Sequence, residues 1–120
     1  MTVRKVLCVD DSAAELDLIS KILQNAGLAV VTANNGKDAI QLANTEAPDL
    51  IFLDIVMLGM DGFTVMRELQ KNSATKNIPV VFVSSKSQKA DQMWAKMQGG
   101  SGFIPKPVSE AAILQELKKF

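Results

Sequence analysis

The sequence predicts a doubly wound α/β domain, with a five-stranded parallel sheet in the order 2-1-3-4-5 and five helices on its faces. Five short apolar runs alternate with five segments of helical periodicity along the chain. The most apolar run shows no polar alternation, which is typical of a strand buried on both faces of a parallel sheet. Each connection must then cross one face of the sheet, and 120 residues is the length of one ordinary domain. We therefore expect residues 1–120 to form a single domain.

The first unit begins with an apolar run at residues 5–9, which ends at two acids, Asp10 and Asp11. From Ser12 onward the apolar residues recur at helical intervals, which predicts a helix that Gly27 terminates. Those apolar residues are Leu16, Ile19, Ile22, Leu23 and Ala26.

The second and third units repeat this arrangement. Residues 28–33 form a second strand, and Asn34-Asn35-Gly36 turns the chain into a helix that Pro48 closes. Four consecutive apolar residues, 50–53, then run into Asp54, and a loop with two glycines leads to a third helix. The apolar positions of these two helices are Ala39, Ile40, Ala43 and Ala47, and then Val65, Met66 and Leu69.

The last two units begin at Pro79, which introduces the apolar run 80–83 that ends at Ser84. A fourth helix is predicted over 88–98, where Gly99-Gly100 stops it. Its apolar residues at helical spacing are Ala90, Met93, Trp94 and Met97. We expect Met93, Trp94 and Met97 in the core, because residues at helical spacing usually face it, and the alternative is a partner-binding face. The remaining strand and helix are predicted at residues 101–104 and 109–117, the helix being capped by Ser109.

Composition excludes several classes of function. Thirteen basic residues balance thirteen acidic ones, so no basic surface for direct binding of nucleic acid or an anionic membrane is expected. No segment is apolar over the length that membrane insertion needs. Histidine is absent, which removes histidine-based acid-base chemistry and most zinc sites. The single cysteine, Cys8, lies in an apolar run and indicates a buried free thiol in a cytoplasmic protein.

Polar side chains follow four of the five predicted strands. Asp10 and Asp11 follow the first strand, Asp54 the third, Ser84 the fourth and Lys106 the fifth, and in a parallel sheet these positions share one edge. Three close carboxylates repel one another unless they share a cation, and oxygen ligands alone favour Mg²⁺. A metal, a carboxylate nucleophile, an amine and a hydroxyl together suit phosphoryl transfer. For any one residue the alternative is an ion pair at a sheet edge.

These residues lie in segments that resemble the receiver domains of two-component response regulators, which have a flavodoxin-like fold. The resemblance extends over essentially the whole chain, and the Trp94 to Gly100 segment is similar to single-domain regulators of chemotaxis and pilus-driven motility. The matching segments are Val9-Asp10-Asp11-Ser12, Leu53-Asp54, Gly59-Met60-Asp61-Gly62-Phe63, Val83-Ser84-Ser85 and Gly102-Phe103-Ile104-Pro105-Lys106-Pro107.

The resemblance implies a phosphoacceptor and a metal site. Asp54 is implied to accept the phosphoryl group, and Asp11 to bind Mg²⁺ directly. Asp10 is implied to assist largely through water, and the backbone carbonyl of Val56 to complete the metal site. Leu58 stands where the family usually has proline, so we expect the rigidity of this loop and the metal affinity to differ from the family pattern.

The resemblance also implies how phosphorylation would be read. Lys106 contacts the phosphoryl group, and Ser84 bonds to it after transfer. Phe103 occupies an aromatic switch position and turns inward as Ser84 moves, which repacks the surface of the fourth helix, fifth strand and fifth helix. The peptide bond from Lys106 to Pro107 is usually cis in this family. Pro105 is a departure that removes a backbone donor at the end of the last strand.

The function implied is a switch that takes a phosphoryl group from a sensor histidine kinase or a phosphotransfer protein and then binds a downstream protein target. Such a protein is not a conventional enzyme, but it catalyses its own aspartyl phosphorylation and dephosphorylation. The alternative is a receiver-like interaction module that works without phosphorylation, which the complete acidic set disfavours. A haloacid-dehalogenase-type phosphatase would need an acid where Val56 or Ser12 stands, and no glycine-rich nucleotide loop is present.

Overall fold

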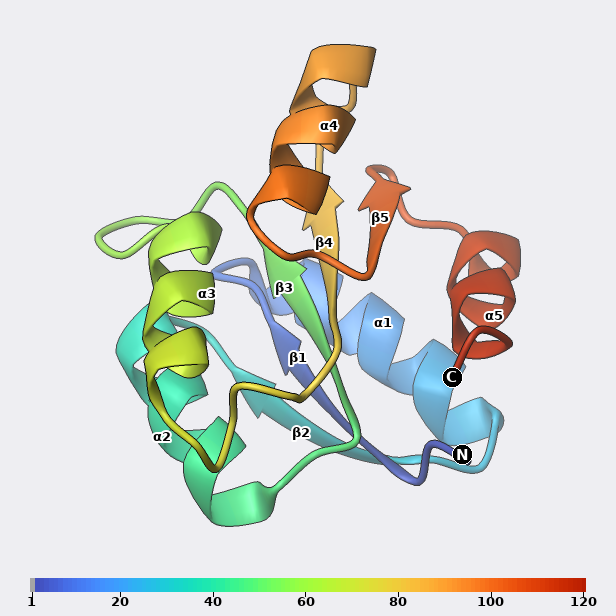
Figure 1. The fold of residues 1–120 in the computed structure, drawn as a ribbon. Coiled ribbons are helices and arrows are strands. Elements are labelled where there is room, and N and C mark those ends of the chain that lie inside the picture. Colours follow the sequence, from blue (N-terminus) through green and yellow to red (C-terminus); the bar gives the residue numbers. More distant parts are fainter. Residues whose placement is uncertain (1) are drawn as a thin grey trace.

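The computed structural model describes residues 2–120, in which five strands alternate with five helices (Figure 1). Neighbouring strands are parallel and follow the order β2-β1-β3-β4-β5, so the predicted fold class and strand order are confirmed. The strands are β1 (Lys5–Val9), β2 (Ala29–Ala33), β3 (Leu50–Asp54), β4 (Val80–Ser84) and β5 (Gly102–Pro105). The helices are α1 (Ala13–Asn25), α2 (Gly36–Glu46), α3 (Gly62–Lys71), α4 (Lys89–Met97) and α5 (Glu110–Leu117).

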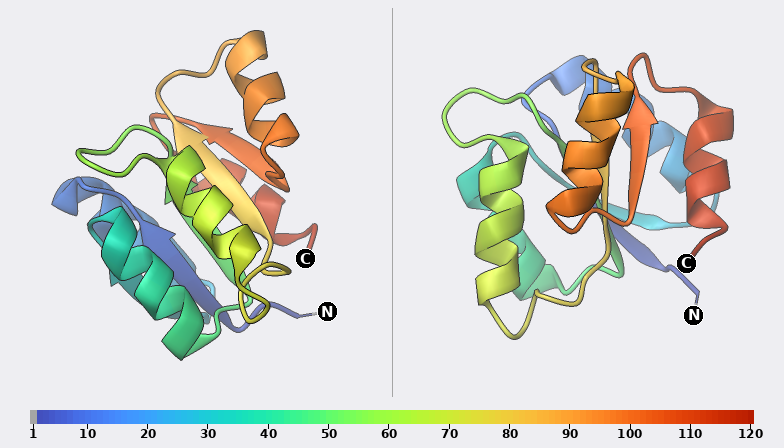
Figure 2. Two further views of the ribbon diagram at one scale, coloured as in Figure 1. Left: turned by 60° about the vertical axis from the view of Figure 1, so that its left-hand side comes forward. Right: turned by 45° about the horizontal axis from the view of Figure 1, so that its top comes forward.

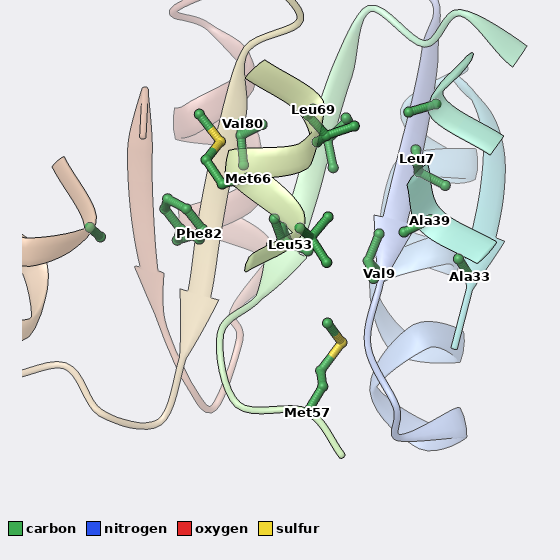
Figure 3. Close-up of a cluster of buried hydrophobic side chains, with 14 residues drawn as sticks. Leu7, Val9, Ala33, Ala39, Leu53, Met57, Met66, Leu69, Val80 and Phe82 are labelled. Carbon is green, nitrogen blue, oxygen red and sulfur yellow. The ribbon is translucent and has the colours of Figure 1, made fainter. Parts of the chain in front are cut away.

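The sheet is covered on both faces. Helices α2, α3 and α4 pack on one face, while α1 and α5 pack on the other, as the two views of Figure 2 show. Within β1, Leu7 faces the first group of helices and Cys8 faces the second, because successive side chains of a strand point to opposite faces. Figure 3 shows the first of these two apolar clusters. Burial on both faces explains why the central strands β1, β3 and β4 contain unbroken apolar runs.

Cys8 belongs to the second apolar cluster and is fully buried. Burial away from water disfavours the thiolate and raises the pKa of the Cys8 thiol to about 12. The prediction of a buried free thiol is therefore confirmed.

Short polar side chains cap the N-termini of α1 and α5, and the cap predicted at Ser109 is confirmed. Ser12 accepts a hydrogen bond from the Glu15 backbone N–H at the start of α1, and Ser109 accepts one from Ala112 at the start of α5. Gly27 follows α1 with a φ of +88°, a left-handed conformation that glycine adopts without strain. These caps fix where each helix starts after its strand.

Helix α4 contradicts the expectation that its apolar residues lie in the core. Met93, Trp94 and Met97 are 59%, 51% and 71% exposed, and Ala95 is the buried residue of this helix. The Gly100 backbone packs closely here, since a Cβ on it would lie 2.9 Å from the Ala95 carbonyl oxygen. Helix α4 thus packs against the sheet through the small side chain of Ala95, and its larger apolar side chains are exposed.

Within residues 2–120, no helix has both the length and the apolar character that crossing a membrane requires.

Candidate functional site

The carboxyl ends of four strands deliver the predicted polar residues to one edge of the sheet. Asp10 and Asp11 follow β1, while Asp54 and Ser84 are the last residues of β3 and β4. Lys106 follows β5, and its Nζ lies 3.0 Å from Oδ2 of Asp10 and 3.3 Å from Oδ2 of Asp54. Parallel strands bring together residues that lie up to 96 positions apart in the chain, between Asp10 and Lys106.

Three carboxylates form a cluster at this edge. Asp10, Asp11 and Asp54 each offer an oxygen within 4.8 Å of the others. Asp10 and Asp54 are buried, whereas Asp11 is exposed. Oδ2 of Asp10 receives no hydrogen bond of good geometry from residues 2–120, although Lys106 stands close to it. Three neighbouring carboxylates with one ammonium group between two of them keep an excess of negative charge, which fits a cation that prefers oxygen ligands, so these residues could hold a metal ion.

Asp54 carries the strongest electrostatic perturbation in the site. Burial and the negative charge of Asp10 raise its pKa to about 6, although Lys106 opposes this rise. For Lys106, burial favours loss of the proton, but contacts with Asp10 and Asp54 outweigh it and raise the pKa of the amine. Lys106 therefore stays charged at neutral pH, and a further cation beside Asp54 would favour its ionised form.

The chain after β1 holds the first two acids in different ways. The Ser12 backbone N–H donates to Oδ1 of Asp10 over 2.9 Å, so the residue that caps α1 also fixes this buried carboxylate. The Asp10 N–H donates to the Ala33 carbonyl on β2 over 3.2 Å. Asp11 instead receives the backbone N–H of Leu58 on Oδ2, at 3.0 Å. Asp10 is thus held by the end of the sheet and the start of α1, and Asp11 is held by the loop after β3.

Gly62 supports the site, although the sequence analysis placed it only in a segment that resembles receiver domains and gave it no role. Its N–H donates to the Ile55 carbonyl over 2.8 Å, which closes the loop that follows Asp54. A Cβ at this position would collide with the Asp54 carbonyl oxygen and lie 2.8 Å from the Ile55 Cα. The start of α3 can therefore press against the backbone of Asp54 only with glycine there. The Asp61-Gly62 pair was the available signal, but its spatial neighbour could not be read from the sequence.

Ser84 and Lys106 are tied together through the backbone. The Lys106 N–H donates to the Ser84 carbonyl over 2.9 Å, and the Lys86 N–H donates to Oγ of Ser84 over 3.1 Å. Since the N–H groups of a strand alternate in direction, position 105 directs its nitrogen away from β4, so Pro105 costs no ladder hydrogen bond. The peptide bond between Lys106 and Pro107 is cis, as expected.

Two of the predicted residues lie at the margin of the cluster. Val56 is 54% exposed and lines, with Ser84 and Trp94, an open pocket of about 350 Å³ between the loop after β3 and α4. Phe103 lies on β5, half-buried, and lines a separate pocket of about 380 Å³ against α4. The structure thus brings the acids, the amine and the hydroxyl to one edge of the sheet. Phe103 lies outside this cluster, within β5 and beside α4.

Comparison with known proteins agrees with this geometry. The model of the response regulator receiver domain matches residues 6–118. The protein PilH of Pseudomonas aeruginosa is 40% identical over 113 residues, which cover 94% of this chain and 93% of PilH. The response regulator PleD of Caulobacter vibrioides is 34% identical over 95% of this chain, which corresponds to 25% of PleD. The chemotaxis protein CheY4 of Vibrio cholerae superposes with a TM-score of 0.91 at 30% identity, covering 98% of both chains. The chain belongs to the family of response regulator receiver domains.

Proposed function

We propose that this receiver domain is a phosphorylation switch in which Asp54 accepts a phosphoryl group and Mg²⁺ is the cofactor. The observation that carries this proposal is the position of one cation, Lys106, against two buried carboxylates beside a third, exposed one. A carboxylate that borders a metal site and an ammonium group is suited to attack phosphorus. The family resemblance supplies the donor, a phosphohistidine on a sensor histidine kinase or a phosphotransfer protein.

In this proposal Asp11, Asp54 and the backbone carbonyl of Val56 would hold Mg²⁺, and Asp10 would assist largely through water. When bound, the metal would neutralise charge on the phosphoryl oxygens. An oxygen of the Asp54 carboxylate forms the new bond to phosphorus while the bond from phosphorus to the imidazole nitrogen breaks. The imidazole leaves with the electron pair and takes a proton from water. Lys106, held in its charged form by the carboxylates, contacts the transferred group, and attack of water later returns the carboxylate and inorganic phosphate.

Ser84 and Phe103 would carry the signal away from Asp54. Ser84 is fully buried and its hydroxyl is held by the Lys86 N–H, so bonding to a phosphoryl group requires it to move. Phe103 borders a pocket beside α4 that is separate from the pocket lined by Ser84, so its ring would have to turn inward to fill the space that Ser84 leaves. The surface made by α4, β5 and α5 would change as a result, and a downstream protein target would read that surface.

The output is proposed to be a protein contact rather than direct binding to nucleic acid. The formal net charge is zero, which provides no general attraction to a polyanion. The chain also spans nearly all of PilH and of CheY4. The buried free thiol of Cys8 fits a reducing compartment, so we propose that this receiver domain acts through protein contacts in the cytoplasm.

Phosphorylation of the intact protein tests the proposal. The protein is incubated with Mg²⁺ and acetyl phosphate, and its mass is measured with and without EDTA. We expect a gain of one phosphoryl group that requires Mg²⁺ and is lost in Asp54→Ala. Asp17→Asn is the matched control, because Asp17 forms an exposed ion pair with Lys21 on α1. This variant should be phosphorylated like the wild type.

The alternative, an interaction module independent of phosphorylation, gives a different result. It predicts no adduct on the wild-type protein under any of these conditions. An adduct that persists undiminished in Asp54→Ala would also overturn the proposal, because the acceptor would then lie elsewhere.

A further inference from the structure

Asp11 is held by a contact that its position in the sequence does not suggest. The Leu58 backbone N–H donates to Oδ2 of Asp11 over 3.0 Å, across 47 residues of sequence. Asp10 and Asp54 share the Lys106 amine, whereas Asp11 is the exposed member of the cluster. The orientation of the Asp11 carboxylate therefore depends on the loop after β3.

The side chain of Leu58 does not contribute to the site. It is 88% exposed, so it contributes little packing to the loop or the site. The loop is closed at its base by the hydrogen bond from Gly62 to Ile55, and Gly59 turns the chain directly after Leu58 with a φ of +77°. What position 58 supplies to the site is its N–H, which aims at Asp11.

We propose that Leu58 is a positioning residue whose backbone N–H orients the Asp11 carboxylate for Mg²⁺. The inference rests on the metal site proposed above. A carboxylate has two oxygens, so holding Oδ2 on the loop leaves Oδ1 to a cation. Donors that orient a ligating carboxylate raise metal affinity, because less rotational freedom is lost on binding. Proline, the usual family residue here, has no N–H and could not make this contact. Leucine restricts the backbone of this loop less than proline would, but it provides the N–H that ties the loop to Asp11.

Two variants separate the N–H from the side chain. Leu58→Ala keeps the donor and removes the exposed side chain, whereas Leu58→Pro removes the donor. The dissociation constant of Mg²⁺ is measured by calorimetry on the unphosphorylated protein, with thermal unfolding in EDTA as the control for folding. We expect about ten-fold weaker Mg²⁺ binding in Leu58→Pro, the low end for loss of such a donor, and little change in Leu58→Ala.

A second measurement needs no proline variant. Hydrogen exchange of the Leu58 amide is followed in metal-free buffer for the wild type and for Asp11→Ala. Because residue 58 is exposed, we expect its amide to exchange at least about ten-fold faster once its acceptor is removed. Equal exchange in the two proteins would overturn the inference, as would equal Mg²⁺ affinity in Leu58→Pro and Leu58→Ala while the wild type binds Mg²⁺. A wild type that binds no Mg²⁺ would overturn the proposed metal site and this inference together.

Discussion

Lys106 reaches Asp54 across the edge of the sheet, with 3.3 Å between the amine nitrogen and Oδ2 of the carboxylate. The same nitrogen lies 3.0 Å from Asp10, so a single positive charge is shared by two buried negative ones. The site therefore carries more negative than positive charge. A divalent cation that binds there would reduce the repulsion between the carboxylates and so stabilise the folded protein.

Removing the Lys106 charge should destabilise the metal-free protein. In Lys106→Met two buried carboxylates lose their shared counterion, and we expect the free energy of unfolding to fall by about 3 kcal/mol in EDTA, the low end for breaking a buried ion pair. Added Mg²⁺ should restore more stability to this variant than to the wild type. Urea denaturation with and without Mg²⁺ measures both effects. Lys21→Met, which removes an exposed i,i+4 partner of Asp17, is the control and should stay within about 0.5 kcal/mol. An equal loss in both variants would contradict the shared-cation description.

The contribution of Asp54 to the stability of the metal-free protein should be more favourable in acid than near neutral pH. Its folded pKa of about 6 lies above the value near 4 of an unfolded chain, so the folded state holds the proton more tightly between these values. Stability is therefore lost as the pH rises from about 4 to about 6, and the loss is complete above the folded pKa. We expect Asp54→Asn to match the wild type near pH 4 and to exceed it by about 2 kcal/mol at pH 7. Urea denaturation of both proteins across this range measures the difference. A difference that does not change with pH would contradict the raised pKa.

Gly62→Ala should damage the fold and the site together. The added Cβ has no room beside the Asp54 carbonyl oxygen and the Ile55 Cα, which are backbone atoms and cannot move aside like a flexible side chain. We expect a loss of about 2 to 3 kcal/mol in unfolding free energy and slower phosphorylation by acetyl phosphate. Gly27→Ala is the matched control, because Gly27 has a positive φ but open space around its Cα. It should lose about 1 kcal/mol and be phosphorylated at the wild-type rate.

Trp94 and Phe82 should respond differently to the same substitution. Phe82 is fully buried in the first apolar cluster, where its ring makes an edge contact with Phe63 at 5.3 Å between centroids. Trp94 is half-exposed on α4. We expect Phe82→Leu to cost about 1 to 2 kcal/mol and Trp94→Leu to cost no more than about 0.5 kcal/mol in chemical denaturation. Similar losses at the two positions would mean that Trp94 packs in the core after all.

The sequence predicted the sheet because burial on both faces leaves an unmistakable apolar run. It also predicted which polar residues converge, since parallel strands deliver Asp10, Asp54 and Lys106 to one edge whatever the details of packing. Helix α4 was assigned wrongly to the core at Trp94. Periodicity identifies an apolar stripe but does not say which side of a helix faces the sheet, and here the small Ala95 side chain does.

Contacts made by backbone atoms could not be predicted. The role of Gly62 depends on how closely the start of α3 approaches Asp54, and that distance is set by packing along the whole of α3. The contact from Leu58 to Asp11 depends on the path of a loop whose side chains carry no instruction about it. Such features follow from through-space geometry rather than from residue type.

The burial of Cys8 makes the protein convenient for site-directed spectroscopy. A thiol that is inaccessible to solvent and protonated at neutral pH will not react with maleimide or spin-label reagents, and it is the single cysteine of the chain. A cysteine introduced at an exposed position such as Met97 would then be labelled alone, without removal of the native one. This label would record whether α4 moves on the proposed phosphorylation, against an otherwise unaltered background.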